Sequence, residues 1–431
     1  MDNQELKYFA LPYGRGNLEY GVDRLQGRFY VFQPDDELKK VTDENRAVKQ
    51  ALSHPIGIGN LQGRVNEHTS VAITVNDKTR PVPNSVLLPP LLNMLRVYGV
   101  KKENITLFIA SGTHVPMTED EFHLLLSEDI ISQYRITAHN CDDIDNLYAL
   151  GCTSRNTPVF VNREFFNTDL KIIVGDIELH HFAGYSGGAK SAAIGLAGRT
   201  TINANHKLLL DDKSTIGCYQ QNPLRQDIEE IGSLMKIDLA LNAVLNKDKE
   251  ILGVFFGKPD AVMKAGISLV DKVSRIQLNH LYEMVIASAG GYPKDINLYQ
   301  AQKAMTHASF FCKPGGVIVL IAECVEGIGS NEYLEFMSGI ESISEVFEKF
   351  KRSDFMVGPH KAFLVARILQ QYRVFLYSSL SSSLVESLML KPIHSLQKIQ
   401  NLVEQLSFGA EVAILPHATA CIATLDNESH D

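Results

Sequence analysis

Residues 170–210 combine side-chain types that a buried core does not need. The segment, LKIIVGDIELHHFAGYSGGAKSAAIGLAGRTTINANHKLLL, joins an apolar strand to the pair His180 and His181, a glycine-rich turn, Lys190 and a third imidazole, His206. Imidazoles carry protons and bind metals near neutral pH, and a glycine-rich turn lets backbone N–H groups approach a phosphate. The segment therefore predicts a site for a phosphorylated cofactor and a metal.

The turn nearly matches a phosphate-binding loop. Residues 184–191, GYSGGAKS, follow the pattern G-x-x-x-x-G-K-[ST] except at Ala189, which stands where a glycine is required. A kinase would also need an acidic strand end downstream, whereas Asp176 lies upstream. The turn still offers three candidates for phosphate contact, Ser186, Gly187 and Gly188. Lys190 is either a nucleophile for covalent attachment to a carbonyl-type group or an ordinary surface lysine.

Two further predicted strand ends carry titratable groups. In the first, Asp77 and Arg80 are close enough in a turn for the carboxylate to orient the guanidinium, which would then bind a carboxylate or phosphate. The alternative is a solvated ion pair. In the second, Thr118 and Glu121 have capping-box spacing, so a helix should begin there and leave His114 in the preceding loop. Such a histidine can act as general acid or base, or can simply bond to backbone.

Two predicted helices carry the remaining candidates. His206 shares the apolar side of a helix over 201–210, where a satisfied core histidine is the alternative to a ligand. Later in the chain, Asp295 is expected to cap a helix that carries Tyr299, Gln300 and Lys303. Tyr299 and Lys303, four residues apart, project from one face. A hydroxyl, an amide and an ammonium suit an anionic oxygen-rich ligand, although a half-exposed polar face would look the same.

The elements that must position these residues alternate between strand and helix. Short β-branched runs predict strands at 70–75, 105–110, 170–174, 284–287, 316–321, 373–377 and 411–415. Helical patterns cover 85–98, 201–210, 297–308 and 361–372. Two such series predict an α/β protein with two doubly wound Rossmann-like domains, mostly parallel sheets and an active-site cleft between them. Ligands of such sheets bind beyond the carboxyl ends of the strands.

Length and pattern also predict the domain limits. A chain of 431 residues is long for one compact unit. We expect an N-terminal cofactor-binding domain over 1–270 and a C-terminal domain over 280–407, with the passage between them within 260–280. The last segment, 408–431, is a candidate to pack back on the first domain.

Composition narrows the class of partner. Hydrophobic residues make up 45% and charged residues 21%, which is typical of a soluble globular protein. A net charge of -9 disfavours nucleic acid and anionic membranes as partners and leaves small polar substrates open. The sequence shows no secretory signal and no run near the roughly 20 apolar residues of a membrane span, which predicts a cytoplasmic protein. Six scattered cysteines without a C-x-x-C pair leave His, carboxylate or a cofactor to hold any metal.

Taken together, five motifs resemble the nickel-dependent lactate racemase family in order and spacing over most of the chain. They are Asp77-Lys78-Thr79-Arg80, Ser111-Gly112-Thr113-His114, His180 ten residues before Lys190, His206 sixteen after it, and Tyr299-Gln300-x-x-Lys303. The resemblance implies racemisation or epimerisation of a 2-hydroxy acid. It also implies a nickel pincer nucleotide, made by dedicated cofactor-synthesis proteins, whose sulfurs and ring carbon bind nickel.

Residue roles follow from the same resemblance. Lys190 would be joined to the cofactor through a thioamide, and His206 would supply a nickel ligand. His114 and His180 would form the acid/base pair while hydride leaves and returns to the α-carbon. Asp77 would orient Arg80 or contact the nucleotide together with Thr79, Ser186, Gly187 and Gly188. The substrate carboxylate would be held by Arg80, Tyr299, Gln300 and Lys303. Self-association is compatible with the sequence.

Some features depart from the family or leave alternatives open. His181 adjoins His180, and only geometry can decide which imidazole faces the substrate. Lactate racemases have a tryptophan near the substrate methyl, but this chain has no Trp, and its corresponding region, 358–363, is richer in polar groups. We therefore expect a substrate larger or more polar than lactate. Two alternatives are an NAD-dependent 2-hydroxyacid dehydrogenase, for which no convincing G-x-G-x-x-G is present, and a non-catalytic nucleotide or nickel carrier, which would need no histidine pair.

Overall fold

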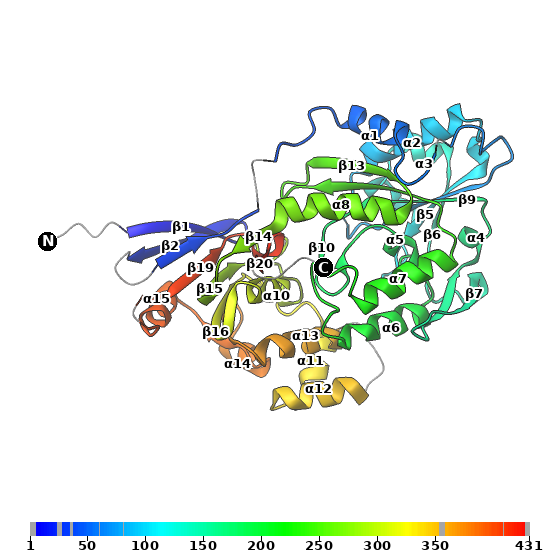
Figure 1. Ribbon diagram of the computed structural model, residues 1–431. Helices are drawn as coiled ribbons and strands as arrows, with labels where there is room; N and C mark the ends of the chain where they lie inside the picture. The colour runs from blue at the N-terminus through cyan, green and yellow to red at the C-terminus, as the bar shows by residue number, and fades with distance from the viewer. Residues whose placement is uncertain are drawn as a thin grey trace. The chain divides into compact units, whose positions relative to one another are not determined.

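The computed structural model describes residues 6–23, 28–34, 38–59, 61–80, 82–352, 358–407 and 409–426. It divides into two compact units, which can be followed by colour in Figure 1. The central unit is Asp36–Val273, and the terminal unit joins Met1–Asp35 to Ser274–Asp431. Each unit is built around its own six-stranded sheet.

The sheet of the central unit is almost entirely parallel. Its strands are β4 (Val71–Asn76), β5 (Ile105–Ala110), β6 (Arg135–Ala138), β9 (Leu170–Asp176), β12 (Leu239–Leu245) and β13 (Ile251–Gly257). They lie in the order β13-β12-β9-β4-β5-β6, and among these neighbours only β12 and β13 run antiparallel. Every residue of β4 and β9 is buried, because helices cover both faces of a parallel sheet.

This strand order creates a switch point. From β4 the chain continues through β5 to β6 on one side, and then returns to place β9 and β12 on the other side of β4. The switch point therefore lies between β4 and β9. In open α/β sheets, ligands bind beyond the carboxyl ends of the strands at such a point.

Helices on both faces complete the core of the central unit (Figure 1). The helices α1 (Glu44–Ser53) and α2 (Asn84–Val97) pack on each other and share a core with alternate residues of β4. On the other face, α5 (Lys190–Ala193) contacts β4, β9 and α7 (Pro223–Leu234). The remaining helices are α3 (Glu128–Gln133), α4 (Arg163–Phe166), α6 (Arg199–Lys207) and α8 (Pro259–Ser274). Two hairpins are formed by β7 (Leu147–Cys152) with β8 (Pro158–Asn162) and β10 (Leu179–His180) with β11 (Gly184–Tyr185).

The terminal unit has a parallel sheet with its own switch point. Its strands are β3 (Arg28–Val31), β15 (Tyr282–Ser288), β16 (Cys312–Ile321), β17 (Arg373–Tyr377), β18 (Lys391–Ile393) and β19 (Glu411–Leu415). They lie in the order β18-β17-β16-β15-β19-β3. The switch point falls between β15, which leads to β16, and β19, which lies on its other side.

Shorter elements surround this second sheet. The helices are α9 (Leu298–Ala301), α10 (Lys303–Ser309), α11 (Asn331–Met337), α12 (Ile343–Arg352), α13 (Pro359–Leu369), α14 (Ser382–Ser387) and α15 (Leu396–Glu404). Two separate strand pairs are β1 (Leu6–Tyr13) with β2 (Gly16–Asp23), and β14 (Arg275–Leu278) with β20 (Ile422–Leu425).

The predicted α/β class with two mostly parallel sheets is confirmed, but the domain limits need correction. The segment 1–35 was assigned to the first domain, yet β3 pairs with β19 at the edge of the terminal sheet. The described part of the segment 408–431 belongs to the terminal unit, where β19 lies between β15 and β3. These strands are too short to reveal their distant partners. The boundary between Val273 and Ser274 falls within the predicted passage, 260–280.

The predicted helix over 297–308 is also corrected. It is two helices, α9 and α10, which meet at Gln302. The cap is Asn297, whose Oδ1 accepts the N–H of Gln300 at 3.1 Å, and not Asp295. Asp295 is buried instead, and its Oδ2 accepts the backbone N–H groups of Gly14 at 2.7 Å and Glu323 at 3.1 Å. These tertiary partners decided the role of Asp295.

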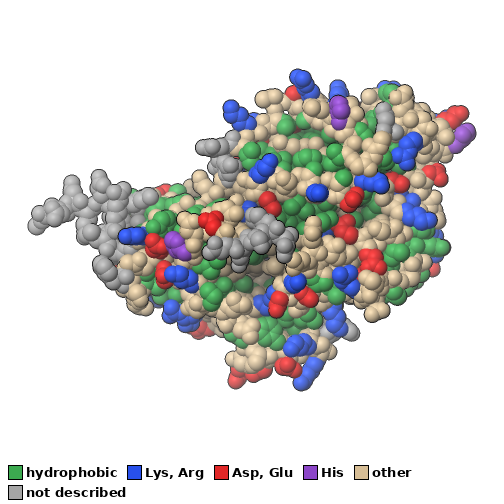
Figure 2. All heavy atoms as spheres, viewed as in Figure 1, with side chains coloured by type: hydrophobic (Ala, Val, Ile, Leu, Met, Phe, Trp, Pro, Cys, Tyr) green, Lys and Arg blue, Asp and Glu red, His purple; other side chains and the backbone are tan. Residues whose placement is uncertain are grey.

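The surface has two plain features. Among the described residues, no helix combines the length and the apolar composition that crossing a bilayer requires. On the face shown in Figure 2, basic and acidic side chains are interspersed and do not gather in one patch of a single sign.

Candidate active site

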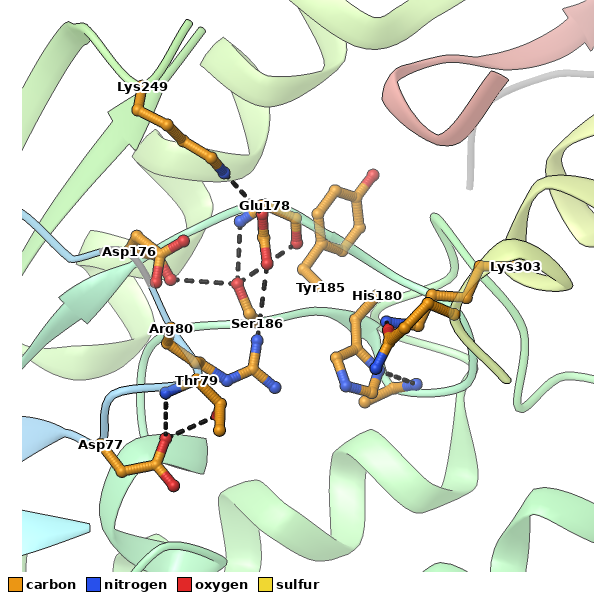
Figure 3. Close-up of polar contacts among 12 residues, drawn as sticks. Asp77, Thr79, Arg80, Asp176, Glu178, His180, Tyr185, Ser186, Lys249 and Lys303 are labelled. Atoms are coloured by element: carbon orange, nitrogen blue, oxygen red, sulfur yellow. Dashed lines mark hydrogen bonds and ion pairs between the residues drawn. The ribbon is translucent and has the colours of Figure 1, made fainter. Parts of the chain in front are cut away.

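The first part of the site is the turn after β4. Asp77 is 5% exposed, and its backbone carbonyl accepts the N–H of Arg80 at 3.1 Å, which closes the turn. Oδ1 of Asp77 accepts two hydrogen bonds from Thr79, at 3.1 Å from the backbone N–H and at 2.6 Å from the hydroxyl. The carboxylate is therefore fixed within its own turn (Figure 3).

The other oxygen of Asp77 reaches across to the end of β5. Its Oδ2 lies 2.6 Å from Nδ1 of His114, whose side chain is 57% exposed. Burial raises the pKa of Asp77, but hydrogen bonds from His114 and Thr79 outweigh burial and hold the pKa below its usual value. Since an ionised carboxylate only accepts, Nδ1 of His114 carries the hydrogen, and Nε2 of the neutral ring offers a lone pair.

This geometry corrects the predicted partner of Arg80. Asp77 orients His114, whereas Nη1 of Arg80 lies 3.4 Å from Oε1 of Glu178, just beyond β9. The other oxygen of Glu178 lies 3.9 Å from Nζ of Lys249, so this carboxylate sits between two cations (Figure 3). Sequence analysis missed Glu178, although its place just after a predicted strand was a usable signal.

Asp176 ends β9 as a second buried carboxyl group. Burial, followed by the negative charge of Glu178, raises its pKa to about 6, and the cations Arg80 and Lys249 act in the opposite direction. Within the described part of the chain, Oδ1 of Asp176 has no hydrogen-bond partner. A buried carboxyl group with such a pKa can exchange a proton near neutral pH.

Lys190 is the first residue of α5 and lies in the field of these groups. Burial, followed by the positive charges of Arg80 and Arg225, lowers its pKa well below the usual lysine value, while Asp176 and Glu178 oppose the shift. A lowered pKa increases the fraction of a lysine that is present as the neutral amine. Such an amine is a nucleophile toward carbonyl-type groups.

The glycine-rich turn before Lys190 is held by contacts within the protein. Oγ of Ser186 accepts the N–H of Glu178 at 2.9 Å and donates to the carbonyl of Asp176 at 3.0 Å. Gly187 has φ +73°, and a Cβ there would lie 2.6 Å from Cγ1 of Ile177. The N–H of Gly188 donates to Oδ1 of Asn242 at 2.9 Å. Close packing therefore explains the glycines, and phosphate contact by Ser186, Gly187 and Gly188 stays a prediction.

The buried Arg225 stabilises the same turn by hydrogen bonds to its backbone carbonyls. Arg225 is fully buried on α7 and donates to the carbonyls of Tyr185 at 2.9 Å and Gly187 at 3.1 Å. Its Nε also donates to Oε1 of Glu229 at 2.8 Å. Sequence analysis did not single out Arg225, because nothing local indicates that a helix arginine will turn inward to bind a distant loop.

The hairpin after β9 places the paired histidines in a ring cluster. His180 and His181 stack with centroids 4.8 Å apart, and the ring of Phe182 lies edge-on to His180 at 4.6 Å. Nδ1 of His180 accepts the N–H of Ala183 at 3.2 Å, so Nε2 carries the hydrogen in the neutral ring. The choice between His180 and His181 as the catalytic residue stays a prediction.

His206 joins this cluster through Phe182, whose ring centroid lies 5.2 Å away. Burial, followed by the charge of Lys190, lowers the pKa of His206 to about 3, so its imidazole is neutral. Neutral imidazole is the form that binds metals. Next to it, Nδ2 of Asn205 donates to Oδ2 of the fully buried Asp227 at 2.9 Å, which fixes the helix that carries His206.

The remaining predicted residues lie together in the terminal unit. Nζ of Lys303 donates to Oε1 of Gln300 at 2.8 Å, and burial followed by the charge of Glu332 raises the pKa of Tyr299 to about 12. The ring of Tyr299 lies 6.3 Å from that of His360 and 5.0 Å from Nζ of Lys361. The structure thus assembles the predicted residues as two groups, one in each unit, and the expected cleft between the units stays a prediction.

Comparisons with known proteins identify the class of enzyme to which the chain is related. The chain is 28% identical over 421 residues to a lactate racemase of Thermoanaerobacterium thermosaccharolyticum, covering 96% of this chain and 98% of the relative. It is 29% identical over 375 residues to a lactate racemase of Lactiplantibacillus plantarum, covering 86% and 88%. These relatives place the chain among the isomerases.

Family models and solved structures agree with this class. The model of the lactate racemase N-terminal domain matches residues 13–217, and that of the C-terminal domain matches 279–423. The chain belongs to the lactate racemase family. The lactate racemase apoprotein structure from T. thermosaccharolyticum superposes with a TM-score of 0.88 at 27% identity and covers 97% of this chain and 100% of that one. A Thermotoga maritima protein shares the fold at a TM-score of 0.64, with 17% identity and coverage of 92% and 100%.

Proposed function

We propose that this enzyme racemises or epimerises a 2-hydroxy acid by removing and returning hydride at the α-carbon. The observation that carries the proposal is the grouping, in one unit, of a desolvated amine, a neutral imidazole and a histidine held by a carboxylate. These are Lys190, His206 and His114 with Asp77. Membership of the lactate racemase family supports the class of reaction, and these side chains are the groups that we propose carry it out.

We infer that Lys190 and His206 hold a nickel pincer nucleotide. The donor set fits this group, since an amine with a lowered pKa can be acylated and a neutral imidazole is a good ligand for nickel. When bound, the group would accept hydride from the substrate and return it. Arg80 adds positive charge beside Lys190, which suits a cofactor or substrate that carries anionic groups.

The two histidines have complementary hydrogen-bonding states in the neutral form. His114 offers a lone pair at Nε2, which can take the proton of a substrate hydroxyl, and Asp77 stabilises the imidazolium that results. His180 offers an N–H at Nε2, which can donate to a substrate oxygen. Inversion needs proton transfer at the hydroxyl oxygen in both directions, so the pair suits a reversible reaction.

Each unit contains cations and donors that are candidates to hold the substrate carboxylate. Arg80, fixed by Glu178, is the candidate in the central unit. Tyr299, Gln300 and Lys303 are the candidates in the terminal unit. His360 and Lys361 lie beside Tyr299, in the region where lactate racemases have a tryptophan, which supports a substrate more polar than lactate.

No observation favours the alternative functions. The turn after β4 is Asp77-Lys78-Thr79-Arg80, whereas a dinucleotide-binding dehydrogenase would have G-x-G-x-x-G between its first strand and helix. A non-catalytic carrier would not need the carboxylate that orients His114. The cytoplasmic location and the dependence on cofactor-synthesis proteins also stay predictions.

The test is the Lys190→Ala variant of enzyme produced together with the cofactor-synthesis proteins. We expect wild-type protein to carry a cofactor adduct and one nickel by intact mass, and to invert 2-hydroxy acids by chiral chromatography. The variant should lose the adduct and at least about a thousandfold of the activity, because the tether positions the reacting group. Lys264→Ala, on the exposed side of α8, is the control. A fully active Lys190→Ala variant would falsify the proposal.

A further inference from the structure

Helix α7 begins with three polar side chains that are fully buried. They are Asn222, which caps the helix, Arg225 and Asp227. Apolar packing of the helix does not need them, because Leu224 and Ile228 already bury its inner side. Burying polar groups is unfavourable unless they form hydrogen bonds, so the partners of these three side chains show what they contribute.

Arg225 binds the turn that leads to Lys190. Its guanidinium donates to the carbonyls of Tyr185 at 2.9 Å and Gly187 at 3.1 Å. Lys190 begins α5, which has only four residues, and a helix this short does not hold its shape by itself. The position of Lys190 therefore depends on what fixes the turn before it. A planar guanidinium that reaches two carbonyls fixes both the distance and the direction of that turn.

Asp227 binds the helix that carries His206. Its Oδ2 accepts the side-chain amide of Asn205 at 2.9 Å and the hydroxyl of Thr157 at 2.8 Å. The same amide nitrogen of Asn205 donates to the carbonyl of Leu224 at 3.1 Å, so it is held at two points of α7. Asn205 immediately precedes His206 in the chain, so these directional bonds set where His206 lies relative to α7.

The cap of α7 binds a third segment. Nδ2 of Asn222 donates to the carbonyl of Phe182 at 2.8 Å, in the hairpin loop that follows His180. Helix α7 also packs against α5 and α6 (Figure 1). One helix thus forms hydrogen bonds with the segments that carry His180, Lys190 and His206. Apolar contacts are non-directional and would let these segments shift along α7, whereas a hydrogen bond specifies its partner atom.

We propose that Arg225 and Asp227 are positioning residues, with Arg225 setting the place of Lys190 and Asp227 that of His206. This inference rests on the proposed function, in which Lys190 and His206 hold one cofactor. Two attachment points on a single group must keep a fixed separation, and functional sites tolerate errors of only about 0.5 Å. Because different side chains of α7 hold the two points, each point can be disturbed independently of the other.

The experiment changes one positioning residue at a time. Arg225→Lys keeps the charge but loses the fork that reaches two carbonyls, and Asp227→Asn keeps the shape but loses one acceptor oxygen. Asn162→Ala is the matched control. Asn162 is also fully buried in the central unit, but its Oδ1 accepts the N–H of Phe165 at 2.9 Å and caps α4, which carries none of the proposed cofactor residues.

Each apoprotein is incubated with purified cofactor-synthesis proteins and their substrates. Intact mass follows the adduct on Lys190, metal analysis during dialysis against EDTA gives nickel per adduct, and thermal unfolding gives the melting temperature. Arg225→Lys should form the adduct at least about tenfold more slowly than wild type. Asp227→Asn should form it within about twofold of the wild-type rate but lose nickel at least about tenfold faster. Asn162→Ala should lower the melting temperature alone.

A merely structural role predicts a different pattern. If Arg225→Lys and Asp227→Asn keep wild-type adduct formation and nickel retention, as expected for Asn162→Ala, the proposal is overturned. It is also overturned if each variant loses adduct and nickel in equal proportion, because α7 would then act only as a whole.

Two milder variants give the same comparisons if a first variant does not fold. Glu229→Gln removes the carboxylate that accepts Nε of Arg225 at 2.8 Å and should slow adduct formation, and Thr157→Val removes a donor to Asp227 and should speed nickel loss. Wild-type values in both would overturn the proposal. If wild type itself forms no adduct and inverts no 2-hydroxy acid, the proposed function fails instead.

Discussion

The two switch points of this protein use a buried aspartate in opposite ways. Asp77 follows β4 and is 5% exposed, while Asp295 follows β15 and is 1% exposed. Asp77 is bound mainly by side chains, the Thr79 hydroxyl and the His114 imidazole. Asp295 accepts two backbone N–H groups from distant segments, at Gly14 and Glu323.

The two aspartates differ in whether their partners can change protonation state. Backbone N–H groups cannot change their protonation state, so Asp295 fixes the path of the chain beyond its strand. An imidazole does change its protonation state, so the carboxylate of Asp77 can both orient a base and stabilise its charged form. The same topological position can therefore hold a carboxylate that faces a titratable imidazole or one that fixes the backbone, and the partners decide which.

The largest effect should come from Asp77→Asn, which tests the chemical side of this comparison. The amide places a donor opposite Nδ1 of His114 and favours the wrong tautomer, so turnover should fall by about 10²–10⁴-fold, while the free energy of unfolding falls by no more than about 2 kcal/mol. Racemisation kinetics and urea unfolding measure the two quantities, and nitrogen NMR reports the tautomer. Asp129→Asn, exposed on α3, is the control. If the Asp77→Asn variant kept wild-type turnover, Asp77 would have no role in the reaction and would not differ from Asp295 in this respect.

A smaller effect is expected when Asp295 is changed to Ala. Two buried N–H groups lose their common acceptor, so the free energy of unfolding should fall by about 2–4 kcal/mol. Turnover per folded molecule at low temperature should stay within a few-fold of wild type. Asp295→Asn keeps one acceptor oxygen and should lose less stability. A stable Asp295→Ala protein with abolished turnover would assign Asp295 to the chemistry after all.

The smallest effect concerns pH and a third aspartate, Asp176. Its pKa of about 6 lies above that of an unfolded carboxyl group, so the folded state binds more protons between these values. The free energy of unfolding should therefore decrease as pH rises from about 4 to about 6, by roughly 1–3 kcal/mol from this residue. Asp77, with a lowered pKa, contributes in the opposite sense, through stability that is lost as pH falls.

Urea unfolding at a series of pH values, with Asp176→Asn as the comparison, measures this contribution. The variant cannot titrate at this position, so its free energy of unfolding should depend less on pH across the same range. If the free energy of unfolding changed equally with pH in wild type and in Asp176→Asn, Asp176 would not be the source of this pH dependence.

Local pattern predicted seven strands of the two large sheets but few of their partners. Three strands, at 105–110, 373–377 and 411–415, have the predicted bounds, because β-branched runs flanked by polar turns are local signals. The capping box of Thr118 and Glu121 is present, with the N–H of Thr118 donating to Glu121 at 3.1 Å. The pairing of Arg80 with Glu178 was not predicted, because Glu178 lies just beyond β9, which is distant from Arg80 in sequence.

The sequence by itself determined the α/β class, the order of the motifs and the residue types available for chemistry, because periodicity and side-chain identity are properties of the chain. Tertiary structure decided which groups meet. It placed Asp77 against His114, set Lys190 where desolvation and the nearby arginines lower its pKa, and set Lys361 beside Tyr299. It also paired β3 with β19, which is distant in sequence, in one sheet. Burial and electrostatic interaction depend on distances in space, which sequence spacing does not specify.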